Sequence, residues 1–351
     1  MRERVQGKSI DRCKVVRKDY FAYNPMRINI GSIARWCDAQ AVMVSPDYVV
    51  FHCDKEKLDP DYLDHFRQSN FWESFMKRAD SGSVRVRIWF SDLGLIQVPL
   101  PPLPEQRKIT EILSTWDEAI DLTQQLITAK QRRKKALMQQ LLTGKVRFGG
   151  FEGVWEEIKL GSLGKFLKGS GITKSELVDD GLPCIRYGEI YTVHHDYIKE
   201  FHSFISDDSA KNSKPIFNGD LLFAGSGETL DEIGKCVAFV GQGEAYAGGD
   251  VIILRLSQGD AKFLGYLMNH NKVRRQIYAR GQGQSVVHIY SSHLKEITIK
   301  LPSLPEQRRI AAVLQACDKE IDLLQQKLAA LQTQKKGLMQ QLLTGKVRVE
   351  V

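Results

Sequence analysis

Residues 100–148 read LPPLPEQRKITEILSTWDEAIDLTQQLITAKQRRKKALMQQLLTGKVRF, and residues 301–349 read LPSLPEQRRIAAVLQACDKEIDLLQQKLAALQTQKKGLMQQLLTGKVRV. The two stretches align at a constant offset of 201 without a gap, and 30 of their 49 positions are identical. A match of this length indicates an internal duplication. We therefore expect the chain to be built from two related halves.

Each copy is predicted to form one long helix. Pro104 and Pro305 stand at the start, where proline is best tolerated, and Gly144 and Gly345 stand at the end, where a glycine can take the left-handed conformation. A helix of about 38 residues is about 57 Å long at 1.5 Å per residue.

Apolar side chains recur along both copies at alternating spacings of three and four residues, which is the coiled-coil pattern. The apolar members of the predicted seam are Leu113, Trp116, Ile120, Ile127, Leu137 and Leu141 in the first copy, and Leu314, Cys317, Ile321, Leu324, Leu328, Leu331, Leu338 and Leu342 in the second. The polar residues Thr123, Lys130 and Lys134 fill the remaining seam positions of the first copy, and Lys335 fills that of the second. A seam this narrow needs a partner, and the other copy is the nearest one. We expect the two copies to pair with each other; two separate helices, each packed on its own globule, are the alternative.

Residues 149–300 form a domain-sized block with a mixed pattern. Short apolar runs separated by glycine-rich turns predict strands, and a longer amphipathic stretch predicts a helix. The expected strands are 184–187, 220–224, 236–240 and 251–256, and the expected helix is 261–279. The sequence therefore favours an α+β globule.

Residues 1–99 repeat the later part of that block. Ile30 and Gly31 align with Ile233 and Gly234 at an offset of 203. Met1 then corresponds to about residue 202, so the first globule is expected to be truncated at its N-terminal side. The predicted domains are a partial globule (1–99), a helical spacer (100–148), a full globule (149–300) and a second spacer (301–351).

The composition excludes several classes of protein. The chain has 351 residues with 42% hydrophobic side chains and contains neither a secretory leader nor a long apolar run, so we expect neither a membrane span nor export. Six scattered cysteines without a C-x-x-C pair favour reduced thiols in the cytoplasm and no metal site. The net charge of +8 is concentrated in the two helical stretches, which each carry +4.

Motifs of catalysis are missing. An adenine methyltransferase would carry an Asp/Asn-Pro-Pro-Tyr/Phe loop, but the nearest match, Asn24-Pro25-Met26-Arg27, lacks its second proline and its aromatic residue. The Gly-Lys pairs lack the rest of a phosphate-binding loop, and no nucleophile-elbow motif occurs. We expect a protein without catalytic activity or a cofactor of its own.

The order globule–helix–globule–helix, with LPEQR opening each helix and LLTGKVR closing it, resembles the DNA specificity subunits of type I restriction-modification systems. VWEEIKLGSLGKF at 154–166 and YNPMRINIGSIA at 23–34 are similar to that family as well. The resemblance implies that each globule is a target recognition domain for one half of a split double-stranded DNA sequence. It also implies that the two helices pair as an antiparallel coiled coil, which spaces these domains and docks two methyltransferase subunits. Those subunits bind S-adenosylmethionine, and restriction and translocase subunits complete the assembly.

Side chains that read DNA must reach base edges, while others bind phosphates. Polar and basic residues in the predicted loops are therefore the candidates. They are Asn24, Arg27, Asn29, Arg85 and Arg87 in the first globule, and Lys165, Lys168, Ser170, Lys174, Arg186, Tyr187, Glu189, Ser226, Glu228, Arg280, Gln282, Gln284 and Ser285 in the second. Each could instead be an ordinary solvated residue.

The short first globule keeps a second hypothesis open. A coiled-coil adaptor, or a remnant that docks partner proteins without reading DNA, would show the same repeat. Methylation of a defined DNA motif by the reconstituted complex distinguishes the two hypotheses.

Overall fold

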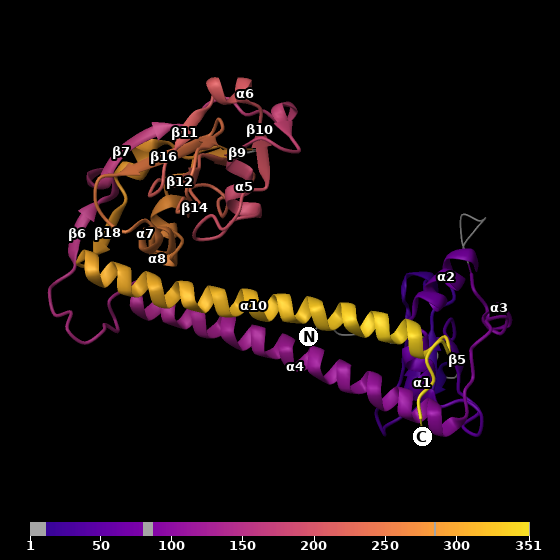
Figure 1. The fold of residues 1–351 in the computed structure, drawn as a ribbon. Coiled ribbons are helices and arrows are strands. Elements are labelled where there is room, and N and C mark those ends of the chain that lie inside the picture. The colour runs from indigo at the N-terminus through magenta and orange to yellow at the C-terminus, as the bar shows by residue number, and fades with distance from the viewer. Residues whose placement is uncertain (1–11, 80–86, 284–285, 351) are drawn as a thin grey trace. The chain divides into compact units, whose positions relative to one another are not determined.

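The computed structural model describes residues 12–79, 87–283 and 286–350. The chain divides into two compact units: unit 1 comprises residues 1–127 and 323–351, and unit 2 comprises residues 128–322. Each unit therefore contains one globule and a part of each long helix. The two long helices are labelled α4 and α10 in Figure 1. The fold is α+β, with two globules that alternate along the chain with two long helices.

The duplicated stretches form the helices α4 (Leu103–Leu141) and α10 (Leu304–Leu342), each of 39 residues, as predicted. In unit 1, the Lys335 ammonium binds Asp117. In unit 2, Lys134 Nζ lies 2.6 Å from an Asp318 oxygen. Within unit 1, Arg348 also binds Glu105, and within unit 2, Lys130 also binds Glu320. In each unit, residue numbers that rise along α4 therefore meet numbers that fall along α10, so the helices are antiparallel.

The seam contains both buried apolar residues and polar residues. Leu113, Ile127 and Leu314 are at most 2% exposed. Lys134 and Lys335 occupy seam positions 201 residues apart, and each meets an aspartate of the opposite helix within its own unit. The polar seam positions are thus accommodated by ion pairs between the helices.

The described residues of unit 1 form two small sheets and three short helices besides its parts of α4 and α10. The strands are β1 (Lys14–Val16), β2 (Phe21–Tyr23), β3 (Ile33–Arg35), β4 (Val42–Val44) and β5 (Val49–Phe51), and the helices are α1 (Pro60–Phe66), α2 (Asn70–Ala79) and α3 (Phe90–Leu93), with a 3₁₀ turn at Ile28–Ile30. The strand orders are β3-β2-β5 and β1-β4. The core joins aromatic residues such as Phe21 and Tyr62 to Leu113 of α4 and Leu343, which follows α10.

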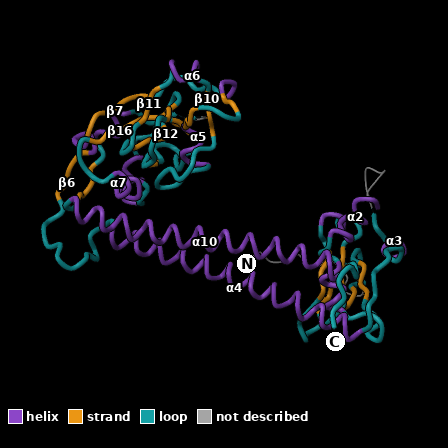
Figure 2. The backbone as a smooth tube through the Cα atoms, viewed as in Figure 1, coloured by secondary structure: helices purple, strands orange, loops and turns teal. Residues whose placement is uncertain are grey.

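Unit 2 contains the larger globule, in which the strands lie together with short helices around them (Figure 2). Its strands are β6 (Glu156–Lys159), β7 (Gly164–Lys168), β8 (Leu177–Val178), β9 (Leu182–Ile185), β10 (Ser203–Ile205), β11 (Lys214–Ile216), β12 (Leu221–Ala224), β13 (Ser226–Gly227), β14 (Cys236–Ala238), β15 (Ala245–Ala247), β16 (Val251–Leu256), β17 (Val287–His288) and β18 (Thr298–Leu301). Its short helices are α5 (Tyr187–Thr192), α6 (Asp207–Lys211), α7 (Ala261–Met268), α8 (Asn271–Tyr278) and α9 (Ser291–Lys295), with 3₁₀ turns at Leu160–Leu163 and Lys174–Glu176. The strand orders are β14-β12-β16-β7, β11-β15-β9-β10-β8, β6-β18 and β13-β17.

Three predicted elements of unit 2 differ from the structure. The strand expected over 236–240 ends at Ala238. The helix expected over 261–279 is two helices, because His270 caps α8 by accepting from the Lys272 amide, and Asn269 turns its side chain to the backbone of Cys236. The strand expected over 184–187 ends at Ile185, since Arg186 instead begins the turn into α5.

The duplication extends into the strand pairing. In unit 1, Phe21 of β2 pairs with Arg35 and Phe51. In unit 2, Leu221 of β12 pairs with Ala238 and Leu254. The number of the paired residue rises by 200 from β2 to β12, by 203 from β3 to β14 and by 203 from β5 to β16. The sheet β3-β2-β5 therefore corresponds in register to β14-β12-β16. The same offsets relate β1-β4 to β11-β15. Among the described residues of unit 1, none forms a counterpart of β6 to β10 or of α5.

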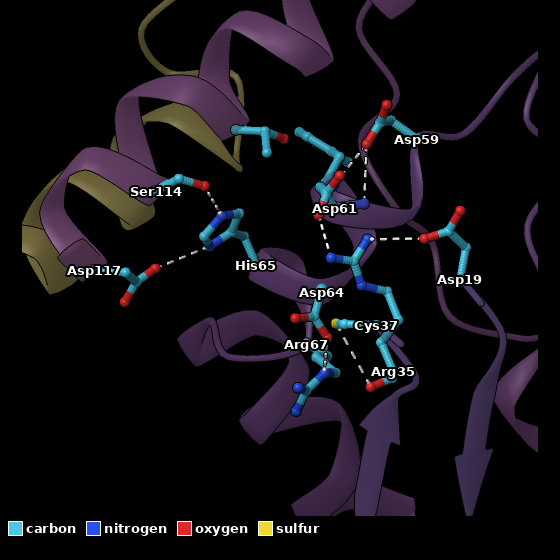
Figure 3. Close-up of polar contacts among 12 residues, drawn as sticks. Asp19, Arg35, Cys37, Asp59, Asp61, Asp64, His65, Arg67, Ser114 and Asp117 are labelled. Atoms are coloured by element: carbon cyan, nitrogen blue, oxygen red, sulfur yellow. Dashed lines mark hydrogen bonds and ion pairs between the residues drawn. The ribbon is translucent and has the colours of Figure 1, made fainter. Parts of the chain in front are cut away.

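The repeated LPEQR motif joins each long helix to its globule. Gln106 Oε1 accepts from the amide of Asp59 at 2.9 Å in unit 1, and Gln307 Oε1 accepts from the amide of Asp260 at 2.9 Å in unit 2. The two aspartates are the N-caps of α1 and α7. In unit 1, His65 of α1 also faces Ser114 and Asp117 of α4, while Arg35 lies between Asp19 and Asp61 (Figure 3).

Candidate nucleic-acid interface

A cleft of about 670 Å³ opens on unit 2. It lies beside the end of β7, the start of α5 and the turn before β16. Its walls are mostly polar and glycine-rich. The residues that line it are Lys168, Gly169, Ser170, Gly171, Ile172, Thr173, Lys174, Arg186, Tyr187, Gly188, Glu189, Thr192, Gly249 and Asp250. Most of them lie in the segments 168–174 and 186–192, so the loop after β7 and the helix α5 build most of the walls.

The loop after β7 has a constrained backbone. A Cβ on Gly169 would lie 2.0 Å from the carbonyl oxygen of Gly248, so only glycine fits there. Ile172 has a φ of 59°, which is a strained conformation for a β-branched residue. Its side chain is 5% exposed and packs with Cys184 and Ile205, so burial of the side chain holds the loop in this shape. The loop is therefore held in place before any ligand binds.

Arg186 is positioned by Glu189. The amide of Arg186 donates to Glu189 Oε2 at 2.8 Å, and Ser203 Oγ donates to Oε1 at 2.5 Å. The glutamate is 7% exposed, and both of its carboxylate oxygens are thus engaged inside the protein. By contrast, the Arg186 Nε is buried, and no acceptor for it exists among the residues that the structure describes. Arg186 is therefore a donor held beside the cleft without a protein partner for its Nε.

Positive charge dominates the exposed rim of the cleft. Lys174 is exposed, and Lys168 Nζ lies 3.9 Å from an Asp250 oxygen while its side chain stays 77% exposed. Glu176, which does not line the cleft, accepts from the Thr173 amide and hydroxyl at 2.7 and 2.6 Å. These hydrogen bonds hold the pKa of the Glu176 carboxyl below its usual value. A rim of this kind suits the phosphates of a nucleic acid.

A buried hydrogen-bond chain connects the cleft to two further loops. Ser226 Oγ lies 3.1 Å from Asp250 Oδ2 and 2.9 Å from His288 Nδ1. The strands β13 and β17 pair at Ser226 and His288, and Gln282 exchanges two backbone hydrogen bonds with His288. Because Ser226 is only 3% exposed, its hydroxyl links the loops and does not face solvent.

The structure brings many of the predicted residues of unit 2 together. Those that line the cleft are Lys168, Ser170, Lys174, Arg186, Tyr187 and Glu189. Ser170 Oγ donates to the Asn212 carbonyl at 2.9 Å, and Ser226 and Gln282 belong to the adjoining loops.

Other predicted residues of unit 2 are not among those that line the cleft. Lys165 lies within β7, Glu228 follows β13, and Arg280 Nη1 donates to the Gln276 carbonyl at 2.8 Å. Gln284 and Ser285 lie outside the described residues.

The predicted residues of unit 1 do not share one cleft. Asn24 Oδ1 accepts from the Met26 amide at 2.9 Å, and Arg27 and Asn29 belong to the turn that follows. Arg87 lines a separate hollow of about 500 Å³ with apolar neighbours such as Phe71 and Leu95. Arg85 lies outside the described residues.

Sequence reasoning missed Thr173, Asp250 and His288. Asp250 has a φ of 60°, and Gly248 and Gly249 precede it, so the Gly-Gly-Asp string was the available signal for a special turn. His288 gave no local signal, because its position beside Ser226 depends on the pairing of β13 with β17.

The described residues hold neither a group of three or more side chains suited to a metal ion nor a helix long and apolar enough to cross a membrane. Two related α+β globules, two long antiparallel helices and a cleft with lysines at its rim define an α+β class of protein built from a duplicated globule–helix unit.

Comparison with known proteins is specific about which class this is. The family model of the type I restriction modification DNA specificity domain matches residues 30–129 and 152–333, so the chain belongs to this family. It is 27% identical over 315 residues to the type I restriction enzyme MjaVIII specificity subunit of Methanocaldococcus jannaschii, covering 84% of this chain and 71% of that protein. It is 28% identical over 321 residues to a putative type I restriction enzyme MjaX specificity subunit of the same organism, covering 85% and 70%.

A solved structure, described as the structural basis of complex assembly and conformational transition of the type I restriction-modification system, shares the fold. Its TM-score is 0.60 at 21% identity, and the match covers 96% of this chain and 84% of that one.

Proposed function

We propose that this specificity subunit reads a bipartite double-stranded DNA target, with unit 2 recognising one half-site through its cleft and unit 1 contributing to the other. The observation that carries the proposal is the convergence of Lys168, Lys174 and Arg186 on one preformed cleft. Arginine is the side chain that most often reads a guanine edge, while lysines bind phosphates.

We propose further that the subunit carries no catalytic site and acts in the cytoplasm by positioning partners. Two methyltransferase subunits, which would bring S-adenosylmethionine, and restriction and translocase subunits would supply the chemistry. The duplicated helices support this arrangement, because the same contacts recur in both units and could present two similar docking surfaces to two identical partners.

The deciding experiment is co-expression with a type I methyltransferase subunit, followed by mapping of methylated adenines on random-sequence DNA. A split motif supports two reading units. A motif with a single defined half-site restricts reading to unit 2. Stable complexes without methylation would overturn DNA reading and favour an adaptor that docks proteins.

The adaptor is a second candidate because of one observation. The segments that build the walls of the unit 2 cleft have no counterpart among the described residues of unit 1.

A further inference from the structure

Unit 1 has open strand edges where unit 2 has paired ones. In unit 2, β16 lies between β12 and β7, and β18 pairs with β6. The counterpart of β16 in unit 1 is β5, which pairs only with β2 among the described residues. The counterpart of β18 is the segment 97–100, which belongs to none of the described sheets. Open edges are sites at which a further strand can add.

The side chains at these edges are apolar and incompletely covered. Residues 49–51 are half-buried, whereas their counterparts Ile252, Ile253 and Leu254 are 7%, 0% and 0% exposed. Val98 is half-buried and Leu100 is 54% exposed, whereas Ile299, the counterpart of Val98, is 3% exposed. The same positions are thus buried in one unit and accessible in the other, which marks a surface shaped for a covering segment.

Unit 2 shows which segment covers these positions. Ile158 of β6 pairs with Ile299, and Leu167 of β7 pairs with Ile253. Leu160 and Leu163, in the turn between the two strands, are both fully buried. One stretch of chain, residues 156–168, therefore closes both edges at once.

The fit is specific at Gly164. A Cβ at this position would lie 2.0 Å from the carbonyl oxygen of Arg255, so β7 approaches β16 too closely for a side chain there. The counterpart of Arg255 at the offset of 203 is His52, directly after β5. Gly164 pairs with Leu256, whose counterpart at the same offset is Cys53. A segment that covers unit 1 in the same register therefore needs a glycine opposite Cys53, beside the His52 carbonyl.

We propose that the open edges of unit 1, at residues 49–53 and 97–100, form a docking surface for a second polypeptide. That polypeptide supplies a strand, a turn with two buried leucines and a second strand in the pattern of residues 156–168. It binds by strand addition, with backbone hydrogen bonds for affinity and the leucines and glycine for specificity.

Docking would have a consequence that rests on the proposed function. The walls of the unit 2 cleft follow β7 directly along the chain, and only Gly249 and Asp250 of its lining come from elsewhere. A partner that continues beyond its β7-like strand would therefore also supply a cleft to unit 1. The identity of the partner would then set the half-site that unit 1 reads.

The test uses the full chain and a synthetic peptide of residues 152–168, EGVWEEIKLGSLGKFLK, labelled for fluorescence anisotropy. We expect saturable binding of one peptide per chain. Hydrogen exchange should slow at residues 49–53 and 97–100 and stay unchanged at residues 252–256. A peptide carrying Gly164→Val should bind about tenfold more weakly or worse, whereas Lys165→Ala, at an exposed position, should bind as the parent peptide does.

A variant of the chain gives a second, independent measurement. Leu160 donates its amide hydrogen to the Ile297 carbonyl at 2.8 Å, so the alternation of an antiparallel ladder places the amide of Ile299 toward β6. Its counterpart is the amide of Val98. Val98→Pro removes this donor and should weaken binding of the parent peptide by about tenfold.

Three outcomes would overturn the proposal. They are the absence of saturable binding, equal affinity of the Gly164→Val peptide, and protection at residues 252–256 in place of unit 1. A dimer of the chain that the peptide does not dissociate would assign the edges to a second copy instead. None of these measurements involves DNA or methylation. The docking proposal can therefore fail while the proposed function stands, and the reverse.

Discussion

Arg147 donates two hydrogen bonds to the carboxylate of Glu306, from Nε at 2.9 Å and from Nη2 at 2.7 Å, and Glu306 is only 1% exposed. The relationship recurs in unit 1, where Arg348 donates to Glu105 at 2.7 and 2.6 Å. The glutamate of LPEQR at the start of one helix thus holds the arginine of LLTGKVR at the end of the other. This pairing explains why both ends of the repeat are the same in the two copies.

Removing the cation of this pair should destabilise unit 2. Arg147→Ala leaves the Glu306 carboxylate buried without its partner, which is among the more damaging electrostatic changes in a protein. We expect the melting temperature to fall by several degrees in calorimetry. Lys159→Ala is the matched control, because the Lys159–Glu296 pair is exposed on both sides and should contribute little. Equal melting temperatures for both variants would contradict a structural role of the pair.

The long helices could be predicted because their signals are local. Proline, glycine and the three-four spacing determine their ends and their seam. The break between α7 and α8 could not be predicted, because Asn269 leaves the helix to satisfy the backbone of Cys236, a strand residue 33 positions earlier. Propensity alone does not reveal such a tertiary contact.

The segments that form the candidate site could be predicted from the sequence, but the roles of their residues could not. Polar loop residues identified Lys168, Lys174 and Arg186. The engagement of Glu189 by Arg186 and Ser203 depends on how α5 packs, so the sequence could not separate this positioning residue from an exposed one. The coupling of Asp250 through Ser226 to His288 joins segments far apart in the chain and was invisible for the same reason.

Substitutions at Arg186 and Lys174 should affect DNA binding in different ways. Arg186→Ala removes a candidate reader of base edges, so binding of the cognate half-site should weaken about tenfold or more, and discrimination at one base pair should relax. Lys174→Ala should weaken the binding of cognate and unrelated DNA alike. It should also reduce the slope of the logarithm of the binding constant against the logarithm of the salt concentration by about 1. Titrations of the methyltransferase complex at several salt concentrations measure both effects.

The control for these titrations is Lys272→Ala. Lys272 is exposed on α8 and does not line the cleft, yet its loss changes the net charge by the same amount. If Lys272→Ala weakens binding as much as Lys174→Ala does, the cleft has no special part in binding phosphates.

His65 should make unit 1 sensitive to acid. The ring is 8% exposed, and burial together with the nearby Lys335 ammonium lowers its pKa, although Asp117, whose Oδ2 lies 3.8 Å from Nδ1, acts in the opposite direction. A folded-state pKa below the unfolded value of about 6.5 means that the folded state prefers the neutral ring. Stability is therefore complete above about pH 6.5 and declines as the pH falls toward the lowered pKa.

Unit 2 suggests the variant that tests this effect. Tyr266 occupies the position equivalent to His65 and donates to Asp318, the counterpart of Asp117. His65→Tyr should lose less melting temperature than the parent chain between about pH 7.5 and about pH 5.5, since a phenol does not ionise in this range. The buried His194 and His270 of unit 2 also have lowered pKa values, so hydrogen exchange at α1 is the readout specific to unit 1. An unchanged pH dependence at α1 would assign the acid sensitivity to other groups.

The sheet of unit 1 should open more readily than that of unit 2. The pairs of β2 with β3 and β5 have the same register as the pairs of β12 with β14 and β16. However, β16 is also paired with β7, and its first four residues are buried. The residues of β5 are only half-buried. Amide exchange tracks the free energy of local opening, which rises with burial and with pairing on both sides of a strand. We expect residues 49–51 to exchange about tenfold faster than residues 252–254, and we expect no such difference between α4 and α10, which have equal length and related sequences. Equal protection of the two strands would mean that β5 is covered in solution, and the peptide of residues 152–168 would then have no open edge to bind.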